Sequence, residues 1–322
     1  MITLSSSKID LWYQCQLKFY AHCILGLKGE YSFATEPRIQ LGSLLHRYFQ
    51  DFYKNHHQVS LFEKDKSKLE NLLKLFETEW KSLSKKLNFK NEGDQEAYFF
   101  KGQKALKNFF AREESRDFHP PLYIEQWFNF PLSKVKLNGR IDRIDREKNG
   151  KVTIIDYKIT DKLPNSSELK DDLQLTIYHL ACQNSILNET PSELILYYPV
   201  QGETFRTTRT SKQLESFEQS IEQILAELDE KKDNLGLYAT NPAEWKCNSC
   251  RFKANCPEHS NKDLSVELSL KEAEELAEKY GFLLSQKDQI IIEIAQIRKK
   301  LKTFMLENKL TSIGKILLNE EF

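Results

Sequence analysis

The sequence predicts an α/β protein in which helices flank a mixed β-sheet. Helical segments come first, a group of strand-like segments follows, and a helix, a strand and a helix come after them. Asn149-Gly150 lies between two of the strand-like segments, and this dipeptide is typical of tight hairpins. The 322 residues suffice for one large domain or two modest ones.

The first third of the chain predicts four helices. Ser5 to Ser7 can cap the first of them, because apolar and aromatic residues follow at helical spacing. Asn91 to Asp94 forms the loop between the third and the fourth. The expected helices cover residues 5–25, 42–53, 65–84 and 95–112.

The middle of the chain predicts the sheet, because apolar residues alternate there and aromatic residues are frequent. Residues 204–210 are expected to pair antiparallel with the strand before them. The other expected strands cover residues 123–130, 135–146, 151–160 and 193–199. Helices are expected over residues 168–184 and 211–231.

The last part of the chain predicts an irregular segment and then a long helix. Residues 240–260 hold three cysteines, and residues 270–308 are helical in pattern, with Gly281 as a candidate break. Apolar residues of this helix repeat every seven positions, at Leu283, Ile290, Ile297 and Phe304. Such a face either packs on its own domain or binds a partner, and we favour packing, because fewer than three heptads are clean.

Composition narrows the class of protein. Lysine plus arginine and aspartate plus glutamate each total 47, so the formal net charge is zero. This balance disfavours broad coating of nucleic acid but allows a local basic groove. The N-terminal residues lack a secretory pattern and no apolar run is long enough to span a bilayer, so we expect a cytoplasmic location and no membrane partner. The six cysteines of such a chain favour metal binding or burial over disulfides.

The densest group of reactive side chains lies on two successive predicted strands. The first contains Gly139-Arg140-Ile141-Asp142, and the second ends in Asp156-Tyr157-Lys158. Alternate side chains of a strand share a face, so Asp156 and Lys158 point the same way. The Asn-Gly hairpin folds Asp142 back beside them. Two carboxylates and an amine are therefore expected to converge.

This combination of residues suits the hydrolysis of a phosphodiester. Asp142 and Asp156 can hold Mg²⁺ or Mn²⁺, and the Tyr157 carbonyl can add an oxygen ligand. The metal would polarise the phosphate and acidify water, and Lys158 would orient the water or stabilise the developing charge. The alternative is a surface hairpin with a cross-strand salt bridge. That alternative does not explain why the apolar pair Ile154-Ile155 leads directly into the charges.

The pattern Gly-x-x-Asp, followed by a hydrophobic strand ending in Asp-x-Lys, resembles the core of the PD-(D/E)XK nucleases. It has the form found in the branch that contains RecB, AddB and CRISPR-associated exonucleases. The resemblance spans roughly residues 3–260 and implies a restriction-endonuclease-like sheet. No proline precedes Asp142, and the second acid is Asp156 instead of glutamate, which are two departures that this branch tolerates. Asp145 competes with Asp142 for the first position, but the family pattern favours Asp142.

Further segments resemble this branch in order along the chain. Gly42-Ser43-Leu44-Leu45-His46 is similar to its Gly-x-x-x-His segment, which implies that His46 is a metal ligand. Glu125 stands where the branch carries a glutamate on the strand before the core. Gln174 and Tyr178 resemble its Gln-x-x-x-Tyr motif, on a helix that contacts DNA and the active site. Without the resemblance, a lone histidine on a helix is more often a packed residue than a ligand.

The resemblance also implies a domain organisation. A nuclease domain is expected over residues 1–262, with a helical insertion at about 54–118. Residues 263–322 are expected to form a C-terminal helical extension.

Four of the cysteines are candidates for a metal cluster. Cys247, Cys250 and Cys256 lie close together, and Cys15 is far away on the first helix. Four thiolates can hold Zn²⁺ or a [4Fe–4S] cluster. Zinc sites usually come as two close pairs, whereas one remote cysteine plus a trio resembles the iron–sulfur site of AddB-type exonucleases. The cluster is therefore the favoured occupant, with a structural role.

Two functions from different classes remain in competition. The favoured one is a metal-dependent exonuclease on single-stranded DNA or DNA ends, in repair, recombination or defence. The other is a non-catalytic subunit that binds DNA ends within a helicase–nuclease complex. The sequence lacks a phosphate-binding loop for ATP, so any helicase that acts with the chain is a separate polypeptide.

Overall fold

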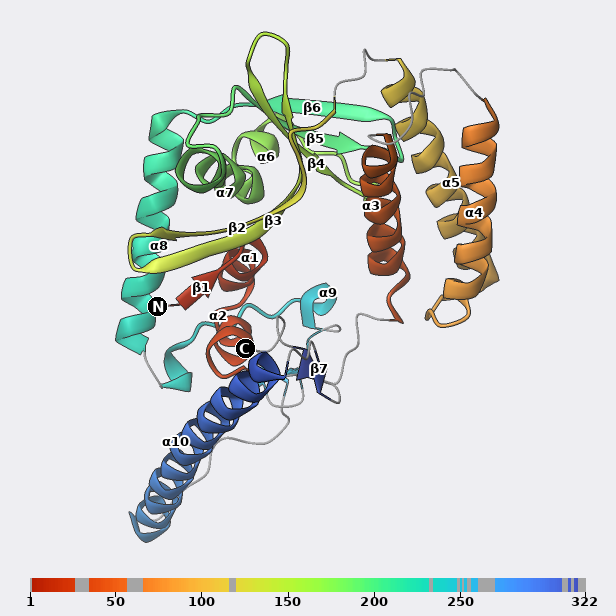
Figure 1. Cartoon of the computed structure of the whole chain (residues 1–322). Coiled ribbons are helices and arrows are strands. Elements are labelled where there is room, and N and C mark those ends of the chain that lie inside the picture. The colour runs from red at the N-terminus through yellow and green to blue at the C-terminus, as the bar shows by residue number, and fades with distance from the viewer. Residues whose placement is uncertain are drawn as a thin grey trace. The chain divides into compact units, whose positions relative to one another are not determined.

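The computed structural model forms two compact units, residues 1–259 and 260–322. The residues that it describes are 2–26, 35–56, 66–115, 120–231, 234–247, 250, 252–253, 256–259, 270–308, 312–313 and 316–317. The first unit is a mixed sheet with helices on both faces, which confirms the predicted fold class (Figure 1). The assignment of residues 1–262 as one functional domain with a helical extension stays a prediction.

The sheet of the first unit has six strands and both pairing directions. The strands are β1 (Ile2–Leu4), β2 (Tyr123–Leu132), β3 (Val135–Arg146), β4 (Val152–Tyr157), β5 (Glu193–Tyr198) and β6 (Glu203–Thr207). The long strand β3 pairs antiparallel with β2 along one edge. Its other edge pairs with β1 at its beginning and with β4 at its end. Strands β4 and β5 run parallel. Strand β6 pairs antiparallel with β5, as predicted, but it ends at Thr207 instead of at residue 210.

The predicted hairpin between β3 and β4 is confirmed. Gly150 has φ +84°, a left-handed conformation that glycine adopts without strain. The Asn149 side chain accepts a hydrogen bond of 2.9 Å from the Lys151 amide. Strand β4 ends at Tyr157, so Lys158 follows the strand directly, whereas the prediction continued it to residue 160. Strand β1 escaped prediction, because three residues are too few to show a period.

The first predicted helix, residues 5–25, is not continuous. Ser5 does cap α1 (Ser6–Gln14), but Cys15 is extended, with φ −169° and ψ 108°. The chain continues as α2 (Gln16–Phe19) and the π-helical turn η1 (Tyr20–Ile24). The Leu17 amide donates to the Ala239 carbonyl at 3.2 Å instead of to a carbonyl of its own helix. This bond to a distant segment explains a break that local periodicity does not show.

The other long helices of the first unit follow the predicted order. The remaining helical segments are α3 (Pro37–His56), α4 (Lys66–Ser84), α5 (Glu92–Glu114), α6 (Ser166–Lys170), α7 (Leu173–Ala181), the π-helical η3 (Cys182–Ile186), α8 (Ser211–Lys231), the short 3₁₀ turn η4 (Leu235–Leu237) and α9 (Glu244–Cys247). Helices α3 and α5 begin five and three residues before their predicted starts, and the two short helices after residue 234 were not predicted. The helix predicted over 168–184 is divided between α6 and α7. Asp172 begins α7 as its N-cap, with its carboxylate accepting from the Leu175 amide at 2.8 Å.

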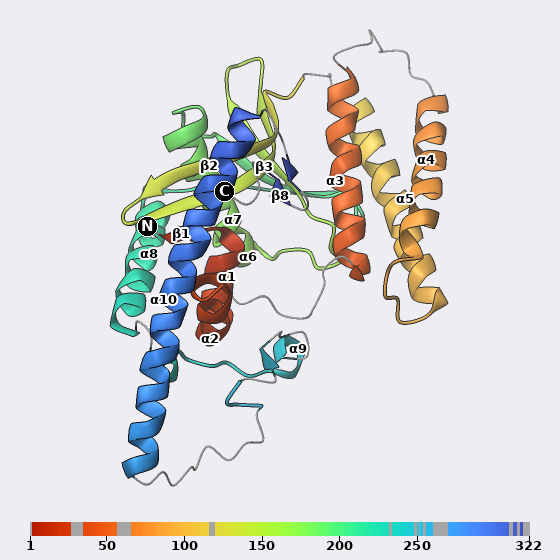
Figure 2. The ribbon, with the colours of Figure 1, turned by 60° about the horizontal axis from the view of Figure 1, so that its bottom comes forward.

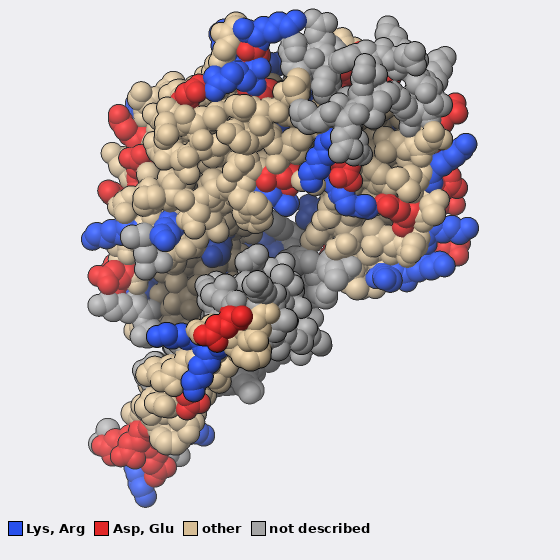
Figure 3. Space-filling view, in the orientation of Figure 1, with Lys and Arg blue, Asp and Glu red and all other residues tan. Residues whose placement is uncertain are grey.

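Each face of the sheet supports its own hydrophobic core. Ile154 belongs to the core formed with α1, α7 and α8. Its neighbour Ile155 belongs to the core formed with α3, α4 and α5, as the alternation of a strand requires. Figure 2 shows these three helices side by side on one side of the sheet. Over α4 and α5, Figure 3 shows acidic and basic side chains interspersed, without a large surface of one sign on the described part of that face.

The second unit contains α10 (Leu270–Glu307), β7 (Ser312–Ile313) and β8 (Ile316–Leu317), and the two strands pair antiparallel. The helix passes through Gly281, so the candidate break there is wrong. Leu283, Ile290, Ile297 and Phe304 are each at least half exposed. The packing of this face on its own domain stays a prediction. Among the described helices, none is long and apolar enough to cross a membrane.

Candidate active site and metal centre

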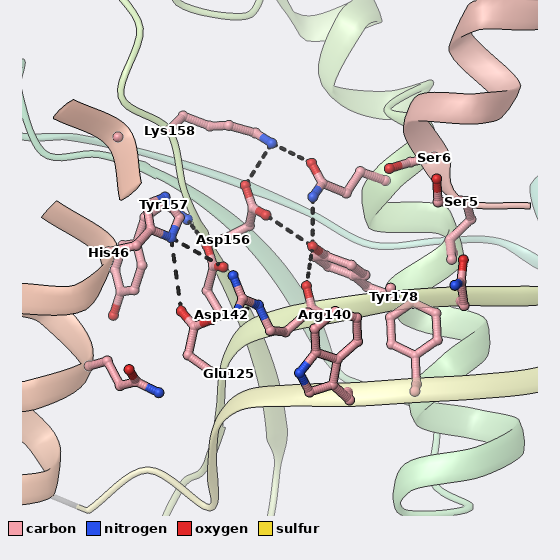
Figure 4. A pocket seen from close by; sticks show the side chains of 18 of the residues that line it. Ser5, Ser6, His46, Glu125, Arg140, Asp142, Asp156, Tyr157, Lys158 and Tyr178 are labelled. Atoms are coloured by element: carbon pink, nitrogen blue, oxygen red, sulfur yellow. Dashed lines mark hydrogen bonds and ion pairs between the residues drawn. The ribbon is translucent and has the colours of Figure 1, made fainter. Parts of the chain in front are cut away.

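One pocket of the first unit contains the predicted reactive side chains. It is open, with a volume of about 670 Å³. Strands β2, β3 and β4 form its floor, α3 lies on one side, and α7 lies on the other with the beginning of α1. Figure 4 shows that the side chains of His46, Glu125, Asp142, Asp156 and Lys158 point toward one another, whereas the Tyr157 ring points away into the core.

Asp142 and Asp156 lie side by side on the floor of the pocket. The hairpin pairs Arg143 with Ile155, which places the two aspartates level on adjacent strands. The Asp142 carboxylate accepts a hydrogen bond of 2.8 Å from the Tyr157 amide. Both residues are buried, at 7% and 2% exposure. Burial raises the pKa of Asp156 to about 6, with the ammonium of Lys158 opposing this shift and the charge of Asp142 adding to it.

A second group of ligand atoms surrounds Asp142. His46 of α3, Glu125 of β2 and Asp142 each offer one atom, and these atoms lie within 4.8 Å of one another. Nδ1 of His46 is 3.4 Å from an oxygen of Asp142 and 4.0 Å from an oxygen of Glu125. Burial opposes the charged form of His46, but Asp142, Asp156 and Glu125 together raise its pKa. Helix α3 and the consecutive strands β2 and β3 thus direct one imidazole and two carboxylates to one point.

Glu125 reaches this point through an unusual backbone conformation. Its φ is +51°, in the left-handed region that residues other than glycine rarely adopt. It lies between the ladder pairs Ile124–Arg143 and Gln126–Ile141, opposite Asp142. Its second oxygen is 2.7 Å from Nε of Arg140. Strain of this kind persists only where surrounding contacts impose it, and it concentrates at functional sites.

The group of candidate ligands overlaps the predicted metal ligands only in part. The predicted metal ligands were His46, Asp142, Asp156 and the Tyr157 carbonyl, with Glu125 predicted only as a catalytic residue. The structure brings Glu125 beside His46 and Asp142, whereas Asp156 forms an ion pair of 2.7 Å with Lys158. The sequence carries no local signal that places Glu125 beside His46 and Asp142, because this placement depends on a left-handed backbone conformation of Glu125 inside a strand.

Lys158 lies at the head of a chain of polar contacts. Its ammonium pairs with Asp156 and donates to the Gln174 side-chain carbonyl. The Gln174 amide donates to the Tyr178 hydroxyl at 2.6 Å. This hydroxyl is 2.7 Å from the Arg140 carbonyl and 3.3 Å from Asp156. Gln174 and Tyr178, one turn apart on α7, therefore position the amine and the second carboxylate (Figure 4).

Asp145 does not share this pocket. Its carboxylate is 2.6 Å from Nε of Arg143. The same guanidinium is 3.2 Å from Glu113 and also hydrogen-bonds the Tyr53 hydroxyl. Because side chains alternate along β3, Arg143 and Asp145 face away from Asp142. Asp145, the other candidate for the first acidic position, thus belongs to a buried polar network beneath α3 and α5.

A comparison with protein families identifies the class of this site. A model of the PD-(D/E)XK nuclease superfamily matches residues 3–257, which is most of the chain. The chain belongs to this superfamily. Its members are phosphodiester hydrolases, which confirms the predicted enzyme class.

Curated relatives of this PD-(D/E)XK chain are much longer proteins. A subunit of the ATP-dependent helicase/deoxyribonuclease of Streptococcus uberis is 28% identical over 164 residues, covering 49% of this chain and 14% of the relative. The subunit of the same name in Streptococcus agalactiae is 29% identical over 176 residues, covering 54% of this chain and 15% of the relative. An uncharacterized protein of Rickettsia conorii is 27% identical over 207 residues, with 61% and 24% covered. The chain therefore spans less than a quarter of the length of each of these relatives.

Solved structures also include similar proteins. A candidate exonuclease of Eubacterium rectale is 14% identical to this chain and superposes with a TM-score of 0.41. The match covers 69% of this chain and 80% of that protein.

Gly139, the glycine of the superfamily-like Gly-x-x-Asp pattern, has a steric explanation. A Cβ at this position would lie 2.7 Å from Cζ of Phe128 on the neighbouring strand. The Phe128 ring, in turn, lies 6.0 Å from the Tyr178 ring in an edge-to-face arrangement. The glycine therefore makes room for a ring that packs beside a residue of the site.

The structure brings the cysteine-bearing segment toward the first helices. The rings of His22 and Phe252 are 4.7 Å apart. Burial raises the pKa of Cys256, the backbone contact with Glu258 opposes this, and the charges of Cys15 and Cys250 add to it. Among the described residues, the ligand group that the structure brings together is His46, Glu125 and Asp142, and the cysteines do not form a second one. The Cys250 amide donates to the Cys247 carbonyl at 3.0 Å, so Cys247 and Cys250 lie in one tight turn.

Proposed function

We propose that this PD-(D/E)XK nuclease is a metal-dependent DNA exonuclease that acts on single strands or on DNA ends. The observation that carries the proposal is the shared pocket: the His46–Glu125–Asp142 group adjoins the Asp156–Lys158 ion pair. A biological role in repair, recombination or defence is consistent with this chemistry.

The donor atoms fit a hard divalent cation. Carboxylate oxygens with one imidazole suit Mg²⁺ or Mn²⁺. We propose His46, Glu125 and Asp142 as ligands, with Asp156 and the Tyr157 carbonyl completing the set. When bound, the cation would supply Lewis-acid activation of the phosphate and of water.

Lys158 is proposed to act on the reacting phosphate group. Burial disfavours its charge, but Asp156, Asp172 and Asp142 together outweigh this effect and raise the pKa of the amine. Lys158 is therefore cationic at neutral pH. A fixed positive charge in a largely buried place stabilises negative charge that develops on phosphate oxygens. Gln174 limits the positions of the amine through the contact with its side-chain carbonyl.

Cleavage of labelled DNA tests the nuclease proposal. Wild-type protein should degrade an end-labelled single-stranded oligonucleotide in Mg²⁺ or Mn²⁺, and EDTA should stop the reaction. Asp156→Ala should reduce the rate at least about a hundredfold, because loss of electrostatic groups at a reacting centre typically costs that much. The reaction products should be resolved over time, so that stepwise shortening from an end is distinguished from internal cutting.

A second carboxylate provides the matched control. Glu189 is exposed and forms an ion pair of 2.8 Å with Arg146, outside the pocket. Glu189→Gln should cleave at the wild-type rate. If wild-type protein binds DNA ends but neither metal supports cleavage, the non-catalytic subunit is the better description.

A helicase, as a separate polypeptide, is a proposed partner. The Streptococcus relatives are named as subunits of an ATP-dependent helicase/deoxyribonuclease. The 322 residues contain no phosphate-binding loop for ATP.

We also propose a [4Fe–4S] cluster held by Cys15, Cys247, Cys250 and Cys256, with Zn²⁺ as the alternative occupant. The spacing of the four cysteines, one remote and three close together in the sequence, supports the grouping. Anaerobically purified protein should show the visible absorption of a cluster, with iron and sulfide in stoichiometric amounts. Zinc without iron would replace the cluster by a zinc site, and neither metal would remove the proposal.

A further inference from the structure

Trp127 is an exposed aromatic residue at the candidate active site. It lies on β2 and is 65% exposed as a residue, whereas Trp12 and Trp80 are each 3% exposed. A tryptophan side chain usually contributes its large apolar surface to a core or an interface. Trp127 instead lines the pocket that contains Asp142, Asp156 and Lys158.

Arg140 accompanies the indole. Trp127 and Arg140 are direct partners in the β2–β3 ladder, so their side chains share a face of the sheet. The guanidinium carbon is 5.4 Å from the centre of the indole ring, in a cation–π contact. Arg140 is itself about half exposed, at 47% of its side chain. An apolar ring and a positive charge are thus presented together to solvent.

The Trp127–Arg140 pair connects directly to the candidate metal ligands. Nε of Arg140 is 2.7 Å from Glu125, and Glu125 belongs to the ligand group with His46 and Asp142. The pair also stands two ladder positions from Asp142, because Gln126 pairs with Ile141 between them. A nucleotide on the indole would therefore lie near the position where the backbone is cut.

We infer that Trp127 and Arg140 form a stacking platform for an unpaired base of the substrate strand. This inference rests on the proposed nuclease function and specifies its substrate class. An aromatic ring stacks on any base, which binds strands without reading their sequence, and a neighbouring arginine adds attraction for the phosphate backbone. Bases inside a duplex are covered on both faces by their neighbours. The platform therefore favours a single strand or a frayed end over an intact duplex.

Binding to strands with and without bases tests the platform. The reference protein is the Asp156→Asn variant in Mg²⁺, which retains the pocket but should not degrade its ligand. Its affinities for a fluorescent oligothymidylate and for an abasic strand of equal length are measured by anisotropy. Adding Trp127→Ala should weaken oligothymidylate binding about 5- to 100-fold, the range contributed by one stacked base, and leave abasic binding unchanged.

Two further variants separate stacking from stability of the sheet. Trp127→Phe should recover part of the lost affinity, because it retains an aromatic face. Phe100→Ala removes another exposed ring, 60% exposed on α5 and outside the pocket, and should bind both strands like the reference. Equal loss for both strands, or no loss for either, would overturn the platform.

The readout distinguishes failure of the platform from failure of the proposed function. If Trp127→Ala in the otherwise wild-type protein cleaves single strands and duplexes with an unchanged rate ratio, the platform fails and the nuclease remains. If the reference protein binds neither strand and wild-type protein cleaves neither, both fail. If strands bind in the base-dependent manner but wild-type protein does not cleave them, the platform stands and the catalytic proposal fails.

Discussion

At the scale of single residues, the sequence predicts the parts of the site that follow from strand alternation. Asp142, Asp156 and Lys158 were expected together because a hairpin sets their register, and the structure places them in one pocket. The association of Glu125 with His46 could not be derived in this way, because φ +51° inside a strand has no periodic signature. Trp127 was not singled out either, since exposure of an aromatic residue in a strand is a property of the folded sheet.

The steric role of Gly139 leads to a prediction. In Gly139→Ala, the new methyl group would meet the buried Phe128 ring at 2.7 Å, so the ring or the strand must shift. Overpacking of this kind typically costs about 1–3 kcal/mol of stability. Cleavage should also slow, by about tenfold, because the shifted ring contacts Tyr178 beside the reacting groups. Chemical denaturation and the oligonucleotide assay measure the two effects.

A compensating substitution checks the cause. Phe128→Leu, combined with Gly139→Ala, removes the ring that the methyl group meets, and should restore part of both stability and activity. A Gly139→Ala protein as stable and as active as wild type would show that the close approach at this position does not constrain the site.

At the scale of elements, prediction succeeded where a segment is long and periodic. Helices α4 and α8 lie within a residue of their predicted bounds, because each presents one continuous apolar face. Prediction of helix boundaries failed where a contact with a distant segment, or a capping residue, ends a helix. The helix break at Cys15 depends on the contact of Leu17 with Ala239, and the division of α6 from α7 depends on the Asp172 cap.

The packing of α3, α4 and α5 predicts that alanine substitutions at two glycines change the free energy of unfolding in opposite directions. A Cβ at Gly102 of α5 would lie 2.2 Å from the buried Phe76 ring of α4 and 3.0 Å from Leu41 of α3. The clash should exceed the helix preference for alanine of about 1 kcal/mol, so Gly102→Ala should lower the free energy of unfolding by about 1–2 kcal/mol. Gly42 of α3 has no atom within 4 Å of such a Cβ, and Gly42→Ala should raise this free energy. Denaturant titration decides, and equal effects at the two positions would refute the packing argument.

At the scale of the whole molecule, the proposed cluster would join two segments that are far apart in the sequence. A ligand at Cys15 and another at Cys247 would close a loop of more than 230 residues. A link across so long a loop restricts the unfolded chain, and binding of the cluster adds to the stability of the folded one. Loss of one ligand should therefore affect stability well beyond its own surroundings.

Two cysteines near the N-terminus make this argument testable by thermal unfolding. Cys15→Ser should lower the unfolding midpoint of the metal-loaded protein by about 5–10 °C, together with loss of bound iron or zinc. Cys23→Ser, in the same segment and also partly buried, lies outside the proposed ligand set and should retain the metal. The active-site carboxylates are unchanged in both proteins. Residual cleavage by Cys15→Ser below its lowered midpoint would show that the cluster holds the ends of the fold without taking part in the chemistry. If both variants keep the metal and melt alike, Cys15 is not a ligand, and the contacts of the first helices alone hold that end of the chain.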